Sequence, residues 1–234
     1  SNRIRDGKFR FRGQSYEYPS NAFGYQHLMH GHGWVRPWQV GEHREHSVEL
    51  VFDCGADLWR WPYRATQHFE LGQTQLKVTS SITNLSQEVM PVGTGLHPYF
   101  DRTHKVRLTA RLSGVWVGDD SCLPERCVEL PPEWDFGAGL RVEELRLDHC
   151  FAGWDGSALI EWPERGTALG IEAAPLFSQL VVYVPPGERF FCVEPVSNAN
   201  DAFNLADRGV EGTGMRELAP GATLSGLVTF RVNP

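Results

Sequence analysis

The sequence predicts an all-β fold, a large antiparallel β-sandwich with a few short helices. Short apolar or alternating segments recur between turn residues, and the 234 residues include 24 glycines and 15 prolines. No window of ten or more residues shows the 3.6-residue apolar period of a helix. Because 41% of the residues are apolar, the chain can bury a sizeable core, and we expect residues 1–234 to form a single domain.

The expected strands follow from their apolar periods. In residues 8–12, Phe9 and Phe11 alternate with basic residues ahead of a turn at Gly13, which predicts a half-buried strand. The other expected strands are VELVFD (48–53), LKVTSSITN (76–84), KVRLTARL (105–112), LGIEAA (169–174), QLVVYV (179–184), RFFCVEP (189–195) and LSGLVTFRV (224–232). Turn signals such as NLSQ, VPPGE and APGATL separate them. The segment ELPPEWDFGAGL (129–140) is expected to be a long irregular connection.

The overall charge and the cysteines limit the class of partner. With 22 basic and 29 acidic residues the net charge is -7, which argues against a nucleic acid or an anionic membrane as main partner and favours a neutral ligand. The five cysteines are scattered without a CxxC pair, which predicts neither a disulfide framework nor a cysteine zinc site and fits a reducing cytoplasm. They are Cys54, Cys122, Cys127, Cys150 and Cys192. The sequence does not decide between a monomer and a homodimer.

Two segments suggest an acid and base pair. In GTGLHPYF (93–100), Pro98 restricts the backbone of His97 to extended conformations and so helps to fix its side chain. In FFCVEPVSNANDAFN (190–204), Glu194 ends an apolar strand, where desolvation favours the neutral carboxyl and moves it toward the range of a general base. Taken singly, the histidine could be a hydrogen-bonded structural residue and the glutamate a strand end. Together they predict a general acid and a general base.

The segment HLMHGHGWVRPW (27–38) combines hydrogen-bond donors with aromatic rings. His30 and Arg36 can donate to hydroxyl groups, and the flat face of Trp34 can lie against a pyranose ring. This mixture suits a sugar.

A metal site is the alternative for the same segment, because a cupin-like cluster could be built from His30, His32, Glu42, His43 and His46. However, Gly31 and the surrounding turn residues disfavour a regular strand, and the acidic residue is not where a cupin motif places it. We therefore predict no metal.

The segment LDHCFAGWDG (147–156) places Asp148 before an aromatic run. Its carboxylate could accept hydrogen bonds from a vicinal diol or could cap a turn. Considered alone, the segment favours the turn cap.

Taken in order, these segments resemble the aldose 1-epimerase (galactose mutarotase) superfamily over nearly the whole chain. The resemblance rests on NRIRDGKF (2–9), HGHGWVRPW, GTGLHPYF, LDHCFAGW, FFCVEPVSNANDAFN and GMRELAPGATL (214–224). It implies a large β-sandwich that holds a monosaccharide and uses a histidine and a glutamate without a metal or an organic cofactor. It also implies opening strands before the segment resembling NRIRDG, so residues 1–234 are expected to lack the N-terminal strands of the domain.

Carried over motif by motif, the resemblance assigns His97 and Glu194 as catalytic residues. Likewise, it implies that Arg3, His30 and Asp148 hold sugar oxygens. Arg36 and Trp34 are added to the substrate-binding set from local composition alone.

The expected reaction is the interconversion of α and β anomers of a hexose through ring opening and reclosure. Glu194 is expected to act as the base and protonated His97 as the acid, with the carboxylate raising the pKa of the imidazole. One alternative is a hexose 6-phosphate mutarotase in which Arg3 or Arg36 binds the phosphate. The other is a carbohydrate-binding protein without turnover. The form HGHGWVRPW is unlike that of the best-understood galactose mutarotases, so the preferred sugar is not identified.

Overall fold

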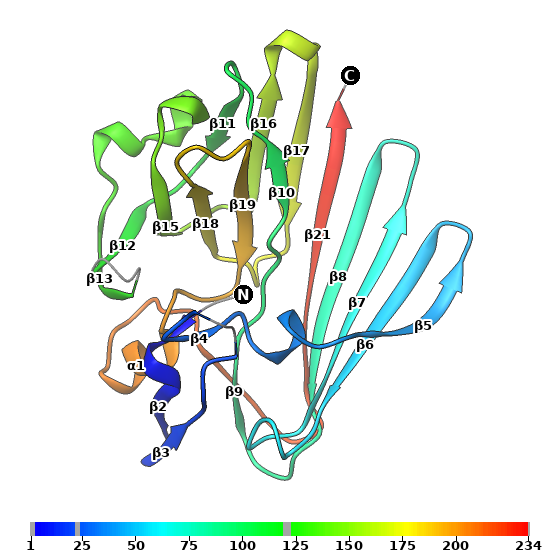
Figure 1. Cartoon of the computed structure of the whole chain (residues 1–234), viewed down its shortest axis with the longest axis vertical. Helices are drawn as coiled ribbons and strands as arrows, with labels where there is room; N and C mark the ends of the chain where they lie inside the picture. Colours follow the sequence, from blue (N-terminus) through cyan, green and yellow to red (C-terminus); the bar gives the residue numbers. More distant parts are fainter. Residues whose placement is uncertain (1–2, 22–23, 119–122, 234) are drawn as a thin grey trace.

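Two large antiparallel sheets dominate the structure, a computed structural model that describes residues 3–21, 24–118 and 123–233 (Figure 1). The nine-stranded sheet has the spatial order β14 (Leu140–Arg141), β11 (Arg107–Ala110), β16 (Ser157–Trp162), β17 (Thr167–Ala173), β21 (Thr223–Asn233), β8 (Gln75–Asn84), β7 (Tyr63–Leu71), β6 (Ser47–Cys54), β5 (Gln39–Arg44). The six-stranded sheet has the order β10 (Tyr99–Asp101), β19 (Phe190–Val196), β18 (Gln179–Val184), β15 (Leu147–Ala152), β12 (Gly114–Gly118), β13 (Pro124–Glu129). The predicted all-β fold class is confirmed.

Three small ladders and a few helical turns complete the structure. The ladders are β1 (Arg3–Ile4) with β4 (Leu28–Met29), β2 (Lys8–Phe11) with β3 (Gln14–Glu17), and β9 (Met90–Val92) with β20 (Arg216–Leu218). The helical elements are α1 (Ala202–Asp207) and the 3-10 turns η1 (Arg5–Gly7), η2 (His32–Trp34), η3 (Pro132–Trp134), η4 (Phe136–Ala138), η5 (Val142–Glu144) and η6 (Pro163–Arg165). In the part of the chain that the structure describes, no helix combines the length and hydrophobicity needed to cross a bilayer.

Each apolar segment predicted as a strand overlaps an observed one, although 105–112 has only its middle, Arg107–Ala110, in a strand. They form β2, β6, β8, β11, β17, β18, β19 and β21, and the irregular connection predicted at 129–140 contains two 3-10 turns. In β2, Phe9 and Phe11 are buried while Lys8 and Arg10 are exposed, as the alternation predicts. The sequence gives no comparable signal for β7, because its inward positions mix apolar and polar side chains.

The main core lies between the two sheets, and one face of the six-stranded sheet is buried in it. On β19, Phe191 and Val193 are fully buried in this core, as are Leu180 and Val182 on β18. Each such side chain contributes about 1.5–3 kcal/mol when it leaves water. Because side chains alternate along a strand, the residues between them point to the opposite face, which we call the site face.

A second, aromatic cluster holds the start of the chain against the far end of the nine-stranded sheet. Phe9 stacks on Trp59 with ring centroids 5.4 Å apart, and Tyr16 lies 4.8 Å from Trp61. Trp59 and Trp61 are buried, so these contacts exclude water. The cluster thereby anchors the β2–β3 hairpin and with it the preceding residues, which reach the site face.

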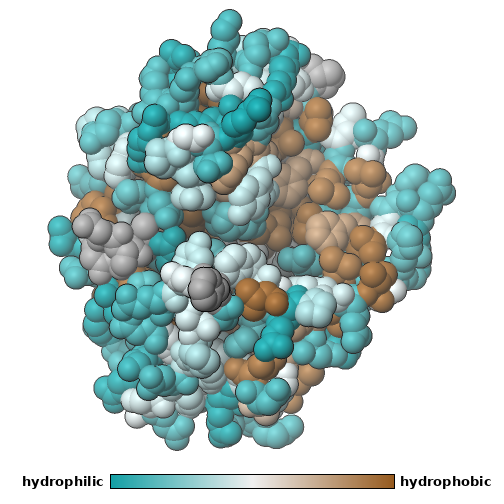
Figure 2. All heavy atoms as spheres, viewed as in Figure 1, coloured by the Kyte–Doolittle hydropathy of each residue, from teal (hydrophilic) through white to brown (hydrophobic). Residues whose placement is uncertain are grey.

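The nine-stranded sheet extends past the six-stranded one through β8, β7, β6 and β5 (Figure 1). Here its inner face carries Phe69, Leu76, Val78 and Phe230, which line a cavity of about 590 Å³. Figure 2 shows hydrophobic side chains gathered in the gap between the two sheets. Apolar side chains thus form much of the cavity wall, and polar ones such as Gln67 and Ser80 lie among them.

Candidate active site

A row of chemically active side chains crosses the site face of the six-stranded sheet. In register across four neighbouring strands lie Asp148, Tyr183, Cys192 and Tyr99. Glu194 lies two residues after Cys192 on β19 and therefore shares its face. Since neighbouring strands are about 4.8 Å apart, Asp148 lies about 10 Å across the sheet from β19. Tyr183 occupies the position between them on β18.

His97 is fixed beside Glu194 by backbone contacts with β19. The Leu96 amide donates to the Pro195 carbonyl at 3.0 Å, and Gly95 forms a bridge with Val196. The chain then enters β10, which pairs with β19 in an antiparallel register. As a result, His97 Nε2 lies 3.2 Å from Glu194 Oε1.

The two side chains differ in exposure. That of Glu194 is 4% exposed and that of His97 is 26% exposed, so the imidazole is the more accessible of the two groups. The ring of Tyr99 stacks on His97 at 4.8 Å with an interplanar angle of 16°. This contact limits rotation of the imidazole and supports its orientation toward Glu194.

Arg3 reaches the site through a short ladder and a buried aspartate. β1 pairs with β4, which places Arg3 opposite Met29. The Asp201 amide donates to the Arg3 carbonyl at 2.8 Å, and Asp201 Oδ1 accepts from the Arg5 amide at 2.9 Å. The Arg3 guanidinium then donates to Asp148 Oδ2 at 2.9 Å. Two residues 145 positions apart thus form an ion pair on the site face.

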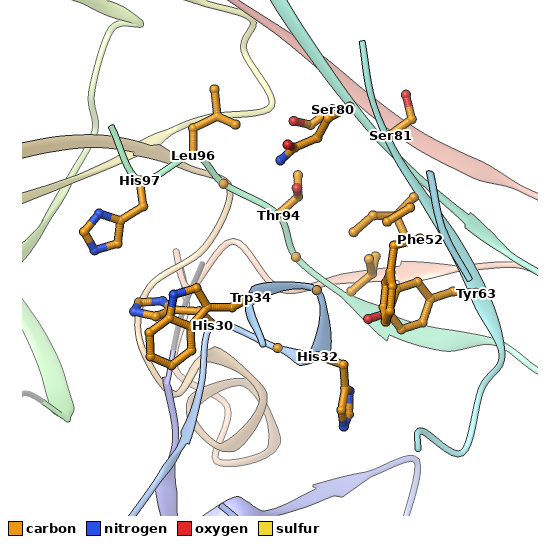
Figure 3. A pocket seen from close by; sticks show the side chains of 18 of the residues that line it. His30, His32, Trp34, Phe52, Tyr63, Ser80, Ser81, Thr94, Leu96 and His97 are labelled. Atoms are coloured by element: carbon orange, nitrogen blue, oxygen red, sulfur yellow. The ribbon is translucent and has the colours of Figure 1, made fainter. Parts of the chain in front are cut away.

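His30 is turned toward His97 by a left-handed backbone. The φ angle of His30 is 50° and that of Gly31 is 72°. Positive φ angles change the direction of the chain after β4, and they cost little only at glycine. The rings of His30 and His97 meet edge to face with centroids 5.3 Å apart. Trp34 lies 5.0 Å from His30 on the next 3-10 turn. Figure 3 shows His30 and Trp34 beside each other and His32 pointing away.

Burial controls the charge of both imidazoles. It lowers the pKa of His30 to about 3, and the positive charges of His97 and Arg3 act in the same direction, while Asp148 opposes them. Burial also lowers the pKa of His97, against the influence of Asp148. The expectation that Glu194 would raise the pKa of His97 above its ordinary value is wrong, because desolvation of the imidazolium is the larger effect.

The cavity between the sheets opens at these residues. His30, Trp34 and His97 form part of its lining, whereas Glu194, Arg3 and Asp148 lie beside this opening on the site face. Further polar side chains, those of Gln67, Ser80 and Thr94, line the cavity among the apolar ones.

Comparison with known proteins identifies the family of the chain. The family model for aldose 1-epimerase matches residues 1–231. The chain belongs to the aldose 1-epimerase family. It is 34% identical to the uncharacterized protein YphB of Escherichia coli K12, across 99% of this chain and 81% of that protein. It is 25% identical to the uncharacterized protein YihR of the same organism, across 87% of this chain and 69% of that protein.

Solved structures of the family share the fold. A crystal structure from E. coli K12 that carries the provisional name aldose 1-epimerase superposes with a TM-score of 0.90 at 34% identity, covering 100% of this chain and 81% of that one. A galactose mutarotase-like protein from Clostridium acetobutylicum superposes with a TM-score of 0.88 at 23% identity, covering 99% of this chain and 77% of that one. The second likeness concerns the fold alone.

The structure does not bring together every residue predicted for this family site. His97 contacts both Glu194 and His30, and Arg3 pairs with Asp148 on the same face of the sheet. Trp34 packs beside His30 with 50% of its surface exposed. The remaining member, Arg36, is exposed and is not part of the cavity lining. It influences the pKa values of His32 and Cys54, which places its charge on the side away from His97.

The interpretation of Asp148 as a turn cap is wrong. The residue lies inside β15 and its carboxylate pairs with Arg3. The segment around it looks turn-like because Gly153 and Gly156 follow, but those glycines end the strand several residues later. The ion pair joins residues that only the fold brings together, so the local sequence does not predict it.

The cupin-like metal cluster is not formed. His32 lies in a 3-10 turn, and Glu42, His43 and His46 are exposed on or just after β5. Within residues 3–21, 24–118 and 123–233, the group of three potential metal ligands is a different one, made of His97, Cys192 and Glu194. Cys54, Cys127, Cys150 and Cys192 are all free, and Cys122 lies outside the described residues.

Sequence reasoning missed three residues of the site. Tyr99 stacks on His97, Tyr183 lies in the cross-sheet row beside Asp148, and Asp201 fixes the backbone of Arg3. Tyr99 could have been found from its place two residues after His97, because an extended strand puts both on one face. Asp201 follows Glu194 in the same quoted segment, but its role depends on a contact with the opposite end of the chain.

Proposed function

We propose that the protein is an aldose 1-epimerase that interconverts the α and β anomers of a free hexose. The observation that carries the proposal is the 3.2 Å contact between His97 Nε2 and Glu194 Oε1 at the mouth of the cavity. A buried carboxylate and a partly exposed imidazole side by side are a base and an acid that can act on two neighbouring oxygens. The anomeric hydroxyl and the ring oxygen of a pyranose are such a pair.

In the proposed reaction the ionised carboxylate of Glu194 accepts the proton of the anomeric hydroxyl. Protonated His97 donates from Nε2 to the ring oxygen as the bond between that oxygen and the anomeric carbon breaks. The open-chain aldehyde forms, and rotation about the adjacent carbon–carbon bond presents its other face. Ring closure then reverses both transfers, so no proton is gained or lost overall.

The surrounding groups support a polyhydroxyl ligand. The Asp148 carboxylate accepts hydrogen bonds and the Arg3 guanidinium donates them, so the ion pair can contact neighbouring hydroxyls of one sugar. His30, held neutral by burial, can donate or accept without adding charge. Nothing in this set requires an anionic substrate.

A phosphorylated hexose is the less favoured substrate. The Arg3 guanidinium is already engaged with Asp148, and Arg36 lies outside the cavity lining. A phosphate would therefore compete with a carboxylate for its cation. The four free cysteines of the described chain support the further proposal that the protein works in the reducing cytoplasm.

NMR exchange spectroscopy of anomer interconversion tests the proposal, over a panel that includes glucose, galactose and glucose 6-phosphate. We expect faster exchange with a free hexose and a loss of roughly 10²- to 10⁴-fold in rate for His97→Asn or Glu194→Gln. Matched controls are His43→Asn and Glu42→Gln, because both residues are exposed on β5.

Circular dichroism checks that each variant is folded. Sugar binding without faster anomer exchange would show a carbohydrate-binding protein and refute the enzymatic proposal. An undiminished rate in Glu194→Gln would refute the assignment of the base.

A further inference from the structure

A thiol joins the acid and base pair on the site face. Cys192 and Glu194 are two residues apart on β19 and so project to the same side, and His97 approaches from the neighbouring chain segment. One potential ligand atom from each of these three residues lies within 4.8 Å of the other two. The proposed reaction uses the imidazole and the carboxyl group, and it gives the thiol no role.

We propose that His97, Cys192 and Glu194 form a binding site for Zn²⁺. Zinc prefers sulfur and nitrogen ligands with carboxylate oxygen, and three protein ligands with an open fourth position are its usual arrangement outside purely structural sites. This chain offers one ligand of each kind. The fourth position would face the mouth of the cavity and take water or a sugar hydroxyl.

The geometry requires little movement. Tetrahedral zinc with bonds of about 2.0–2.3 Å holds its ligand atoms about 3.4–3.6 Å apart. His97 Nε2 and Glu194 Oε1 are already 3.2 Å apart. The sulfur lies within 4.8 Å of the other two ligand atoms, so it has to close a gap of about 1.4 Å at most, which rotation of a cysteine side chain can provide.

The charges also fit a divalent cation. Binding releases the thiol proton to solvent, so the ion meets a thiolate, a carboxylate and a neutral imidazole, whose formal charges cancel those of Zn²⁺. Cys192 is fully buried and Glu194 nearly so, which favours a neutral assembly over separate charges. The ion can enter beside His97, whose side chain is 26% exposed.

Metal binding should inhibit catalysis, an expectation that rests on the proposed function. The ion occupies the lone pairs of both groups that would carry protons, so it competes with anomer exchange. The site would make the enzyme sensitive to free zinc. Binding itself does not depend on the protein being an epimerase.

Cobalt titration of the metal-free full chain tests the binding site. We expect one equivalent of Co²⁺ to produce a thiolate-to-cobalt charge-transfer band in the near ultraviolet, and one equivalent of Zn²⁺ to remove it. Cys192→Ala should lose the band, and His97→Asn should bind at least tenfold more weakly. Cys127→Ala is the matched control, because this free cysteine is exposed on β13.

Two results would overturn the proposal: no charge-transfer band in the wild-type protein, or a band of full intensity in Cys192→Ala. His97→Asn keeps the buried strand intact, so it tests the site even if the cysteine variant fails to fold. In the activity assay, Zn²⁺ should inhibit wild type at least tenfold more strongly than Cys192→Ala. A protein that binds zinc but never speeds anomer exchange would retain the metal site and lose the proposed function.

Discussion

Acid should destabilise this protein through the buried imidazole of His30. Its pKa falls from the ordinary value of 6.5 to about 3 in the folded state, chiefly because burial disfavours the charged ring. Between these values the unfolded chain holds a proton that the folded chain does not. The free energy of unfolding therefore rises with pH in this interval and falls on acidification.

The magnitude follows from the linkage between protonation and folding. From pH 7.5 to pH 5.0, protonation of an ordinary histidine in the unfolded state is worth about 2 kcal/mol, and His30 in the folded state remains neutral. His32, His97 and His149 have pKa values lowered by burial as well, so they add to the total loss in wild type. A variant at position 30 isolates one contribution from the rest.

The test is urea unfolding of wild type and His30→Gln at the two pH values, followed by tryptophan fluorescence. Glutamine keeps a polar side chain but does not titrate. We expect wild type to lose about 2 kcal/mol more than the variant between pH 7.5 and 5.0. The exposed His46 provides the control, since His46→Gln should keep the wild-type dependence. Equal losses in wild type and His30→Gln would show that burial does not hold this imidazole neutral.

Three further predictions concern the site and its support. Asp148→Asn removes the charge of a carboxylate proposed above to accept from sugar hydroxyls and should raise KM about tenfold with a smaller change in kcat, measured by steady-state anomer exchange; an unchanged KM contradicts it. Tyr99→Ala should lower kcat about three- to tenfold and Tyr99→Phe should restore it, because stacking positions His97; equal rates in both variants contradict this. Gly214→Ala should cost about 2 kcal/mol or more in urea unfolding, since its φ is 74° and a Cβ would lie 2.2 Å from the Ser197 carbonyl; wild-type stability contradicts it.

The fold could be predicted because local alternation and burial agree. In RFFCVEP the apolar Phe191 and Val193 alternate with Cys192 and Glu194, and the structure buries the first pair in the core between the sheets. Such a pattern defines a strand and its two faces. It does not identify the partner strand. The alignment of Asp148 with Tyr99 across the sheet is therefore seen only in the register of the folded strands.

The candidate site was harder to predict wherever a contact joins distant segments. The ion pair between Arg3 and Asp148 spans 145 positions, and the local sequence around Asp148 favours a turn cap instead. Local composition places Arg36 with His30 and Trp34, yet the fold leaves Arg36 exposed and outside the cavity lining. The lowered pKa of His97 depends on how deeply the fold buries it, which a single sequence does not reveal.

The alternation on β19 links the stability of the domain to the precision of the site. Phe191 and Val193 hold the strand in the core, and the alternating residues Cys192 and Glu194 are buried on the site face. Burying the carboxyl group of Glu194 costs free energy, and the adjacent imidazole offsets part of that cost when it is protonated. The same burial lowers the pKa of His97. A protonated imidazole would stabilise the carboxylate of Glu194, but burial disfavours the charged form of the ring. A sugar that exchanges protons with both groups, as proposed above, would serve the carboxylate and the imidazole in turn, and for this reason the pair suits acid and base chemistry.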